Sequence, residues 1–191
     1  MARFARAVSS LAVLGLAMCR EPSAVAPPSK SALRASRDNA PRVQVYRVDF
    51  DEVNNSGVKA HATLQVIDGS LVVTLDAVGR VPEQIHPQHI HGFPTQTSTC
   101  PTLANDTNHD GIISFAEGLP AFGPVQVDLQ PYPTPTNSAG ATHFHATFVS
   151  SQVPFDPSEL TQKTMVLHGD FVAGSYVASL PVACGRVQSV N

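Results

Sequence analysis

The chain has 191 residues, of which 42% are hydrophobic and only 14% are charged, which suits one core with short appendages. With 16 prolines and no tryptophan, it is unlike a coiled coil or a highly charged disordered chain. From Asp49 onward, 13 acidic residues stand against 4 basic ones, which gives about −9. Because such a charge repels phosphate groups, the composition argues against nucleic-acid binding.

The first 19 residues have the pattern of an export signal. Arg3 and Arg6 precede an apolar stretch, residues 7–18, that is too short to span a bilayer. The run Leu16-Ala17-Met18-Cys19 also resembles a bacterial lipobox, with methionine in place of the usual small residue before the cysteine. Two outcomes stay open: simple cleavage, or a lipid anchor on Cys19. The protein is expected in the periplasm, in the cell envelope as a lipoprotein, or outside the cell.

Residues 20–42 are predicted to form a flexible tether. They are rich in alanine, serine and proline, and they carry five basic against two acidic side chains. Such a segment has too few large apolar groups to form a core. Its positive charge suits either contact with anionic headgroups or simple solvation. The folded domain is therefore expected to span residues 43–191.

From Val43 onward, hydrophobic residues alternate with polar ones, as in half-buried strands. Residues 58–66 and 71–75 show this period, and Asp68-Gly69 between them is a hairpin turn signal. Further strands are predicted at residues 43–50, 88–93, 125–129, 142–149, 164–168 and 176–183, and short helical stretches at 115–119 and 158–162. The chain is therefore predicted to be all-β, an antiparallel sandwich or flattened barrel.

Residues 106–117, with the sequence Asp-Thr-Asn-His-Asp-Gly-Ile-Ile-Ser-Phe-Ala-Glu, match the constrained positions of an EF-hand calcium loop. Calcium prefers six to eight oxygen ligands. The predicted donors are the side chains of Asp106, Asn108, Asp110, Ser114 and Glu117 and the carbonyl of Ile112. Gly111 permits the sharp turn, and Ile113 fills the apolar position that ties the loop to a core. The alternative is an Asx-rich turn without an ion.

The segments that flank this loop are short. Pro101 limits the entering helix, and Pro120 limits the exiting one. Since the sequence contains a single loop of this kind, opening of the calmodulin type is not expected. A structural calcium ion that cross-links a long excursion between strands is the prediction.

Cys100 and Cys184 remain as an even pair if Cys19 belongs to the processing site. Since disulfides form in oxidising compartments, an exported chain is expected to join them. The alternative is two buried free thiols.

His89 and His91 are two residues apart on a predicted strand, so their side chains share one face about 7 Å apart. Ile90 between them then points into the core. An all-imidazole pair of this kind suits copper or zinc better than calcium. The alternative is two ordinary surface histidines, the class in which His61 and His109 are placed.

The same alternation places three further histidines on outward faces. His143 and His145 flank the core residue Phe144, and His168 follows the core residue Leu167. Histidines of three separated strands are therefore expected to gather on the outside of the sheet. Whether His143 or His145 joins the group stays open.

Several short motifs resemble, in chain order, the copper-ligand and disulfide landmarks of the copper/zinc superoxide dismutase family. They are His89-Ile90-His91-Gly92, His143-Phe144, the strand ending at His168, and Ala183-Cys184-Gly185. The resemblance covers residues 43 to the end. It implies a Greek-key β-sandwich with a Cys100–Cys184 bridge. It also implies copper held outside the barrel by His89, His91, His143 and His168, with His143 mediating proton delivery.

The chain departs from that family at two places. The EF-type loop stands where the family has its zinc-binding loop, and Pro181 stands where it has the arginine that attracts superoxide. Without this cation, steering of an anion is weak.

The resulting hypothesis is a secreted or lipid-anchored calcium-binding protein with a copper-binding histidine cluster. A copper-dependent dismutase is the catalytic version of it. A non-catalytic envelope module for copper storage or adhesion is the alternative. The protein partner is left open.

Overall fold

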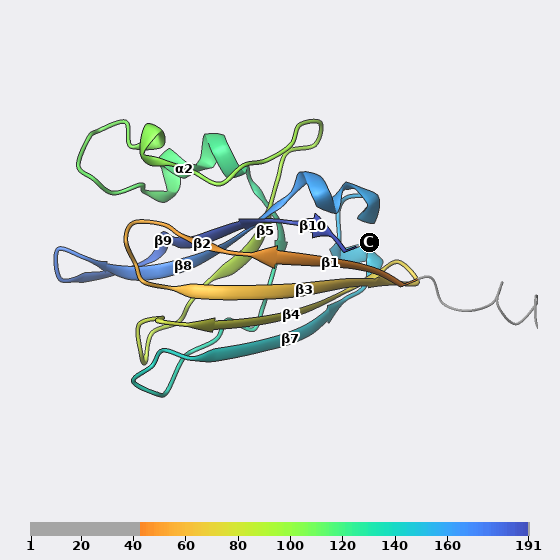
Figure 1. Ribbon diagram of the computed structural model, residues 1–191, viewed down its shortest axis with the longest axis horizontal. Helices are drawn as coiled ribbons and strands as arrows, with labels where there is room; N and C mark the ends of the chain where they lie inside the picture. Colours follow the sequence, from red (N-terminus) through yellow and green to blue (C-terminus); the bar gives the residue numbers. More distant parts are fainter. Residues whose placement is uncertain (1–42, 191) are drawn as a thin grey trace, which may run out of the picture. The chain divides into compact units, whose positions relative to one another are not determined.

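The computed structural model describes residues 43–190; the predicted export signal, Cys19 and the tether lie outside the described residues. Within that part, two five-stranded antiparallel sheets pack face to face (Figure 1). The first sheet has the order β10-β1-β3-β4-β7 and the second β2-β9-β8-β5-β6. The prediction of an all-β sandwich is confirmed.

The first sheet contains β1 (Val43–Asp49), β3 (Lys59–Ile67), β4 (Ser70–Val78), β7 (Thr142–Phe148) and β10 (Gln188–Ser189). The second contains β2 (Asp51–Glu52), β5 (Gln88–His91), β6 (Val125–Asp128), β8 (Thr164–Val172) and β9 (Ser175–Arg186). The helical segments are α2 (Phe115–Phe122) and the 3-10 turns η1 (Leu103–Asn105), η2 (Ser150–Gln152) and η3 (Pro157–Gln162). Every predicted strand is present, and the short edge strands β2 and β10 were not predicted.

The core lies between the two sheets because the strands alternate as the sequence indicates. In the hairpin β3–β4, Leu64 pairs with Val73, and both side chains are fully buried. They face Ile90 and Leu167 of the second sheet in one apolar cluster. Burial of such side chains stabilises a fold by about 1.5–3 kcal/mol each.

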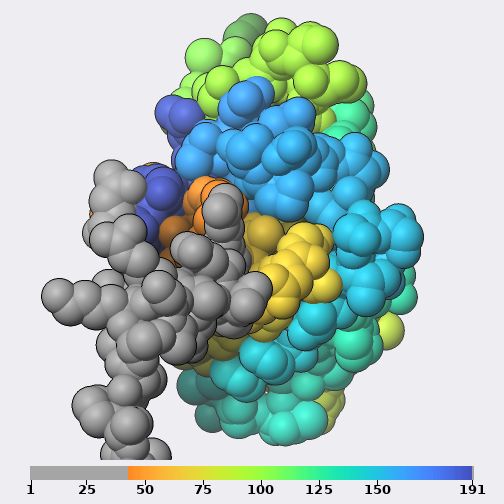
Figure 2. All heavy atoms as spheres, turned by 90° about the vertical axis from the view of Figure 1, so that its right-hand side faces the viewer, coloured from red at the N-terminus to blue at the C-terminus, as the bar shows by residue number. Residues whose placement is uncertain are grey.

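One end of this core is closed by the connection between β7 and β8. Val153 and Leu160 are buried in the core cluster, and Phe155 packs against it. Tyr46 of β1 donates a hydrogen bond from its hydroxyl to the carbonyl of Pro157, at 3.4 Å. Figure 2 looks at this end, where the connection, in blue, lies beside β1, in orange, and the β3–β4 turn, in yellow.

A long connection between β5 and β6, residues 92–124, lies on the outer side of the second sheet, at the top of Figure 1. It carries the predicted calcium loop and α2, which ends at Gly123. Ile113 and Phe122 from this insert form a second apolar cluster with Val53, Val166 and Cys184. The predicted contact of Ile113 with a core is confirmed.

The predicted disulfide between Cys100 and Cys184 is present, with the Cα atoms 5.6 Å apart and a sequence separation of 84. It joins the insert to β9. Within residues 43–190, no helix has the length and apolar character needed to cross a membrane.

Candidate metal centre

Three of the predicted ligands converge on the outer side of the second sheet. His89 and His91 lie on β5, and His168 lies on the neighbouring strand β8. Their ring centroids are 5.1–5.7 Å apart, and one nitrogen from each ring lies within 4.8 Å of the other two. The alternation of side chains along a strand predicted that His89 and His91 share one face, and this prediction is confirmed.

Two of the rings are held by backbone carbonyls. Nδ1 of His91 lies 2.8 Å from the carbonyl oxygen of Gly123, and Nδ1 of His168 lies 3.0 Å from that of Ser179. Since a carbonyl oxygen only accepts, each Nδ1 carries the hydrogen and donates it. This leaves Nε2 of both rings with a free lone pair.

His89 is held by a different pair of residues. Its Nε2 lies 3.1 Å from the Tyr132 hydroxyl and 3.5 Å from Oδ1 of Asp128. The Tyr132 hydroxyl donates to Asp128, so its oxygen accepts from Nε2–H of His89. Burial and the bond to Asp128 raise the pKa of Tyr132 to about 12, which keeps the phenol protonated. The free lone pair of His89 is therefore on Nδ1.

The remaining ring nitrogens are the candidate metal ligands. Nδ1 of His89, Nε2 of His91 and Nε2 of His168 are buried and have no hydrogen-bond partner among residues 43–190. Buried polar groups in native proteins are nearly always satisfied. Three imidazole lone pairs that converge fit the ligand set of a transition metal and do not fit an oxygen-preferring ion.

Burial keeps the three rings neutral, which metal binding requires. It lowers the pKa of His91 to about 4 and also lowers that of His89. The pKa of His168 lies well below its usual value, because of burial first and then the neighbouring histidines and buried Arg80. At neutral pH all three lone pairs are therefore available.

The insert covers this centre. Phe122 of α2 packs on His91 with ring centroids 4.6 Å apart, and Phe115 lies 5.9 Å from His168. His91 and His168 are therefore buried rather than exposed on the sheet. A cavity of about 310 Å³ reaches His89 and His168 and is otherwise lined by Pro87, Phe115, Val125, Tyr132, Ala178 and Ser179, none of which is cationic.

Gly123 has a backbone conformation that suits its place beside His91. Its φ is +79°, and a Cβ there would lie 2.7 Å from the carbonyl oxygen of Gly92. A side chain would strain the turn that brings its carbonyl to His91.

The structure does not bring His143 or His145 to the three histidines. Both lie on β7, in the first sheet, and are exposed. Nδ1 of His143 is 2.7 Å from Asp76, and Nδ1 of His145 is 2.9 Å from the Thr74 hydroxyl. The outward faces of two packed sheets point in opposite directions. The outward side chains of β7 therefore lie on the opposite side of the sandwich from those of β5 and β8. The centre therefore has three of the four expected histidines.

The predicted calcium loop, residues 106–117, has internal hydrogen bonds from its backbone amides to its own side chains. Asp106 accepts from the amide of Gly111 at 2.9 Å, Asn108 from that of Asp110 at 2.9 Å, and Asp110 from that of Ile112 at 2.8 Å. Gly111 has φ +83°, as the sharp turn requires. Oδ1 of Asp106 is buried and has no partner among the residues that the structure describes.

Glu117 ties the two ends of the loop together. Oε1 accepts from the amide and hydroxyl of Thr107, both at 3.0 Å, and Oε2 accepts from the amide and hydroxyl of Ser114, at 2.9 and 2.7 Å. These bonds, led by that of the Ser114 amide, lower the pKa of Glu117 to about 2. The histidines are the one group of three or more ligand atoms within 4.8 Å in residues 43–190, so the loop carboxylates are not gathered that closely.

Asn54 fixes the loop to the second sheet. Its amide group donates to the carbonyls of Ile113 and Pro181, both at 3.0 Å, and its carbonyl accepts from the amide of Ile113 at 2.7 Å. Pro181 pairs with His168 in β9 and β8. The loop and the histidines therefore share one rigid support.

Sequence reasoning missed Asp128, Tyr132, Gly123 and the two phenylalanines of α2 that surround the histidines. Asp128 lies opposite His89 in the β5–β6 pairing, so the register of these two strands is the signal that finds it. No family model matches this chain, and no curated protein matches it.

Proposed function

We propose that the protein is an exported β-sandwich that binds one copper ion through His89, His91 and His168. Two observations carry the proposal: one nitrogen from each of the three rings lies within 4.8 Å of the other two, and each ring buries one nitrogen that has no hydrogen-bond partner in residues 43–190. Imidazole suits copper and zinc, and a given site generally holds Cu²⁺ more tightly than Zn²⁺. Export is supported by the disulfide, which is typical of oxidising compartments.

The chain's own residues prepare the rings for the ion. Gly123 and Ser179 fix Nδ1–H of His91 and His168, and Tyr132 with Asp128 fixes Nε2–H of His89. Such partners orient the ligands and raise their basicity. A copper ion held here would supply one-electron redox chemistry and Lewis acidity.

The order of the strands supports a Greek-key sandwich of the superoxide dismutase type. After β4 the chain crosses to the second sheet for β5 and β6, and it then returns to place β7 beside β4. Connections that cross between sheets in this way are typical of Greek-key sandwiches. The similarity to the superoxide dismutase fold is a proposal about the fold only, because a fold does not imply an activity.

The residues around the three histidines favour a copper-binding protein without dismutase activity. The cavity beside His89 and His168 has no cationic lining residue, and Pro181 lies opposite His168 where the family's arginine is expected. The lining therefore supplies no cationic side chain that would steer superoxide into the cavity. Superoxide decay measured with the copper-loaded protein, against free copper at equal concentration, decides between a dismutase and a storage or adhesion module.

Removal of one ligand tests the copper proposal. We expect His168→Gln to weaken Cu²⁺ binding about 100-fold, because only two imidazoles of the buried set remain. Equilibrium dialysis and nitrogen couplings in the electron paramagnetic resonance spectrum measure the change. His145→Gln, which changes an exposed histidine on the first sheet, is the matched control and should keep the copper affinity and the nitrogen couplings of the unmodified protein. Equal affinity and equal nitrogen couplings in both variants would remove the proposed site.

We further propose that the loop at residues 106–117 binds one calcium ion. The specific observation is the buried, unpartnered Oδ1 of Asp106 at the first ligand position, noted above for the described residues. The loop runs directly into α2, whose Phe115 and Phe122 pack on the histidines. Calcium would therefore order the segment that covers the copper centre.

Calcium is expected to raise the thermal midpoint of the protein by about 3–6 °C at 2 mM, if the affinity is about 0.1–1 mM as in extracellular modules. The comparison is with the same protein in a calcium chelator. Asp106→Asn should abolish the shift, whereas Asp68→Asn in the exposed β3–β4 turn should keep it. Copper affinity measured in both solutions should be higher with calcium. Identical midpoints with calcium and with chelator would refute calcium binding.

A further inference from the structure

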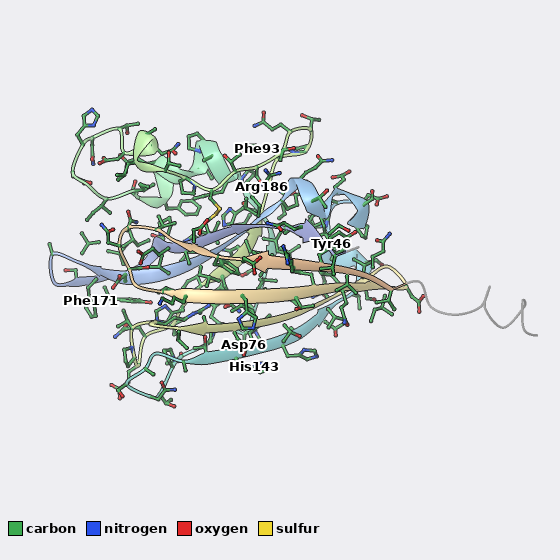
Figure 3. All side chains as sticks on the ribbon, viewed as in Figure 1. Tyr46, Asp76, Phe93, His143, Phe171 and Arg186 are labelled. Carbon is green, nitrogen blue, oxygen red and sulfur yellow. A yellow bond between two sulfur atoms is a disulfide. The ribbon has the colours of Figure 1, made fainter. Side chains whose placement is uncertain are left out.

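A row of ionisable side chains crosses the outer face of the first sheet, away from the copper centre. His61 of β3 pairs with Asp76 of β4, and Asp76 pairs with His143 of β7. All three side chains point outward and are 45–71% exposed, while their neighbours Ala62, Leu75 and Phe144 are buried in the core. Figure 3 labels Asp76 and His143 at the opposite side of the sandwich from α2.

Both imidazoles face the same carboxylate. Nδ1 of His143 lies 2.7 Å from Oδ1 of Asp76, and Nε2 of His61 lies 3.7 Å from Oδ2. These residues line one side of a hollow of about 610 Å³ on this face. The row is exposed to solvent, so its nitrogens and oxygens are accessible to an ion.

The charged side chains near the row balance one another. Asp76 faces the two imidazoles, and Asp49, paired with His61 on β1, lies 3.6 Å from Arg47. Lys59, which also lines the hollow, is the remaining cationic side chain there. Two carboxylates stand against two cations, so a divalent ion depends on direct ligation rather than on long-range attraction.

In the structure the ligand atoms of His61, Asp76 and His143 do not all lie within 4.8 Å of one another, but the spacing of their strands permits ligation by all three side chains. Neighbouring strands lie about 4.8 Å apart, so His61 and His143 are separated by about 10 Å across Asp76. Two imidazoles that lean toward the middle strand span this separation, with metal–nitrogen bonds of about 2.0 Å. The carboxylate of Asp76 then lies directly below the ion. In the structure each ring contacts its own oxygen of Asp76, so binding requires both rings to turn inward.

We propose that His61, Asp76 and His143 form a second, surface site for a divalent transition metal, for which Zn²⁺ is the probe. Two imidazoles and one carboxylate, with solvent at the fourth position, are a donor set that zinc accepts. The site is independent of the copper centre because it lies on the other sheet. It gives His143 a role in metal binding different from the one expected from the sequence.

Histidine ring signals in proton NMR test the site during a titration of the whole protein with Zn²⁺. The Hε1 signals of His61 and His143 should change together, with one common midpoint, while that of His145 stays constant. The buried histidines report on the other centre in the same spectra. The failure of one site is therefore distinguishable from the failure of the other.

Substitution of the shared ligand sharpens this test. We expect Asp76→Asn to weaken zinc binding at His61 and His143 about tenfold or more, since an amide is a poorer ligand than a carboxylate. His145→Gln is the control, because it changes the neighbouring exposed histidine of β7 and should keep the affinity. Separate midpoints for His61 and His143, no response at millimolar zinc, or unchanged affinity in Asp76→Asn would each overturn the proposal.

Discussion

Reduction of the Cys100–Cys184 disulfide is expected to lower the free energy of unfolding by about 4 kcal/mol. The bond closes a loop of 84 residues, and in the chain-entropy model such a cross-link removes about this much from the unfolded state. Cys184 is fully buried beside Val166, and Phe122 belongs to the same cluster. Loss of the bond therefore also removes the covalent link between the insert and β9.

Denaturant unfolding of the oxidised and reduced protein measures this change. The thermal midpoint should fall by about 10 °C, given the usual relation for a domain of this size. The double variant Cys100→Ala with Cys184→Ala separates the cross-link from packing, because the reduced protein keeps both sulfur atoms and the variant does not. If the oxidised and reduced proteins unfold at the same denaturant concentration, the bond contributes nothing to stability.

The periodic parts of the fold were predictable because burial of one face imposes the alternation. The β3–β4 hairpin follows from apolar residues at every second position around Asp68-Gly69, and both strands are observed. Ile113 was predicted from the loop pattern and is 3% exposed. These features depend on residues that are close in sequence, so the sequence pattern directly reflects which side chains are buried.

The set of residues in the candidate metal centre was only partly predictable. Alternation tells on which side of its own strand a residue lies, and it does not tell which sheet the strand joins. His143 is outward-facing as expected, yet β7 pairs with β4 and not with a strand of the second sheet. His89 and His91 share a strand, so no pairing was needed to bring them together.

The burial of the centre depends on contacts between distant segments. His91 is fully buried although it faces outward from its sheet, because α2 covers it. Tyr132 reaches His89 from the connection that follows β6. Neither contact has a periodic signal in the sequence, and both follow from the path of the insert and of that connection.

Phe115 and Phe122 of α2 form an aromatic cover over the histidines, and truncation of Phe122 should have the second large effect on stability. Phe122→Ala is expected to lower the free energy of unfolding by about 3–5 kcal/mol, as for other buried phenylalanines. The Phe122 ring is fully buried and packs on His91 and on Phe115. Leu119→Ala on the same helix is the matched control, since Leu119 is 37% exposed, and should cost less than about 1 kcal/mol.

The same substitution connects the cover to metal binding. Gly123 follows Phe122 directly and accepts the hydrogen bond that holds His91. A loosened α2 would leave His91 free to rotate, so copper affinity should fall in Phe122→Ala and stay constant in Leu119→Ala, by equilibrium dialysis. Phe122→Leu, which keeps most of the volume, should lie between them. If Phe122→Ala unfolds like the unmodified protein, α2 does not stabilise this face, and the histidines depend on the strands β5 and β8 alone.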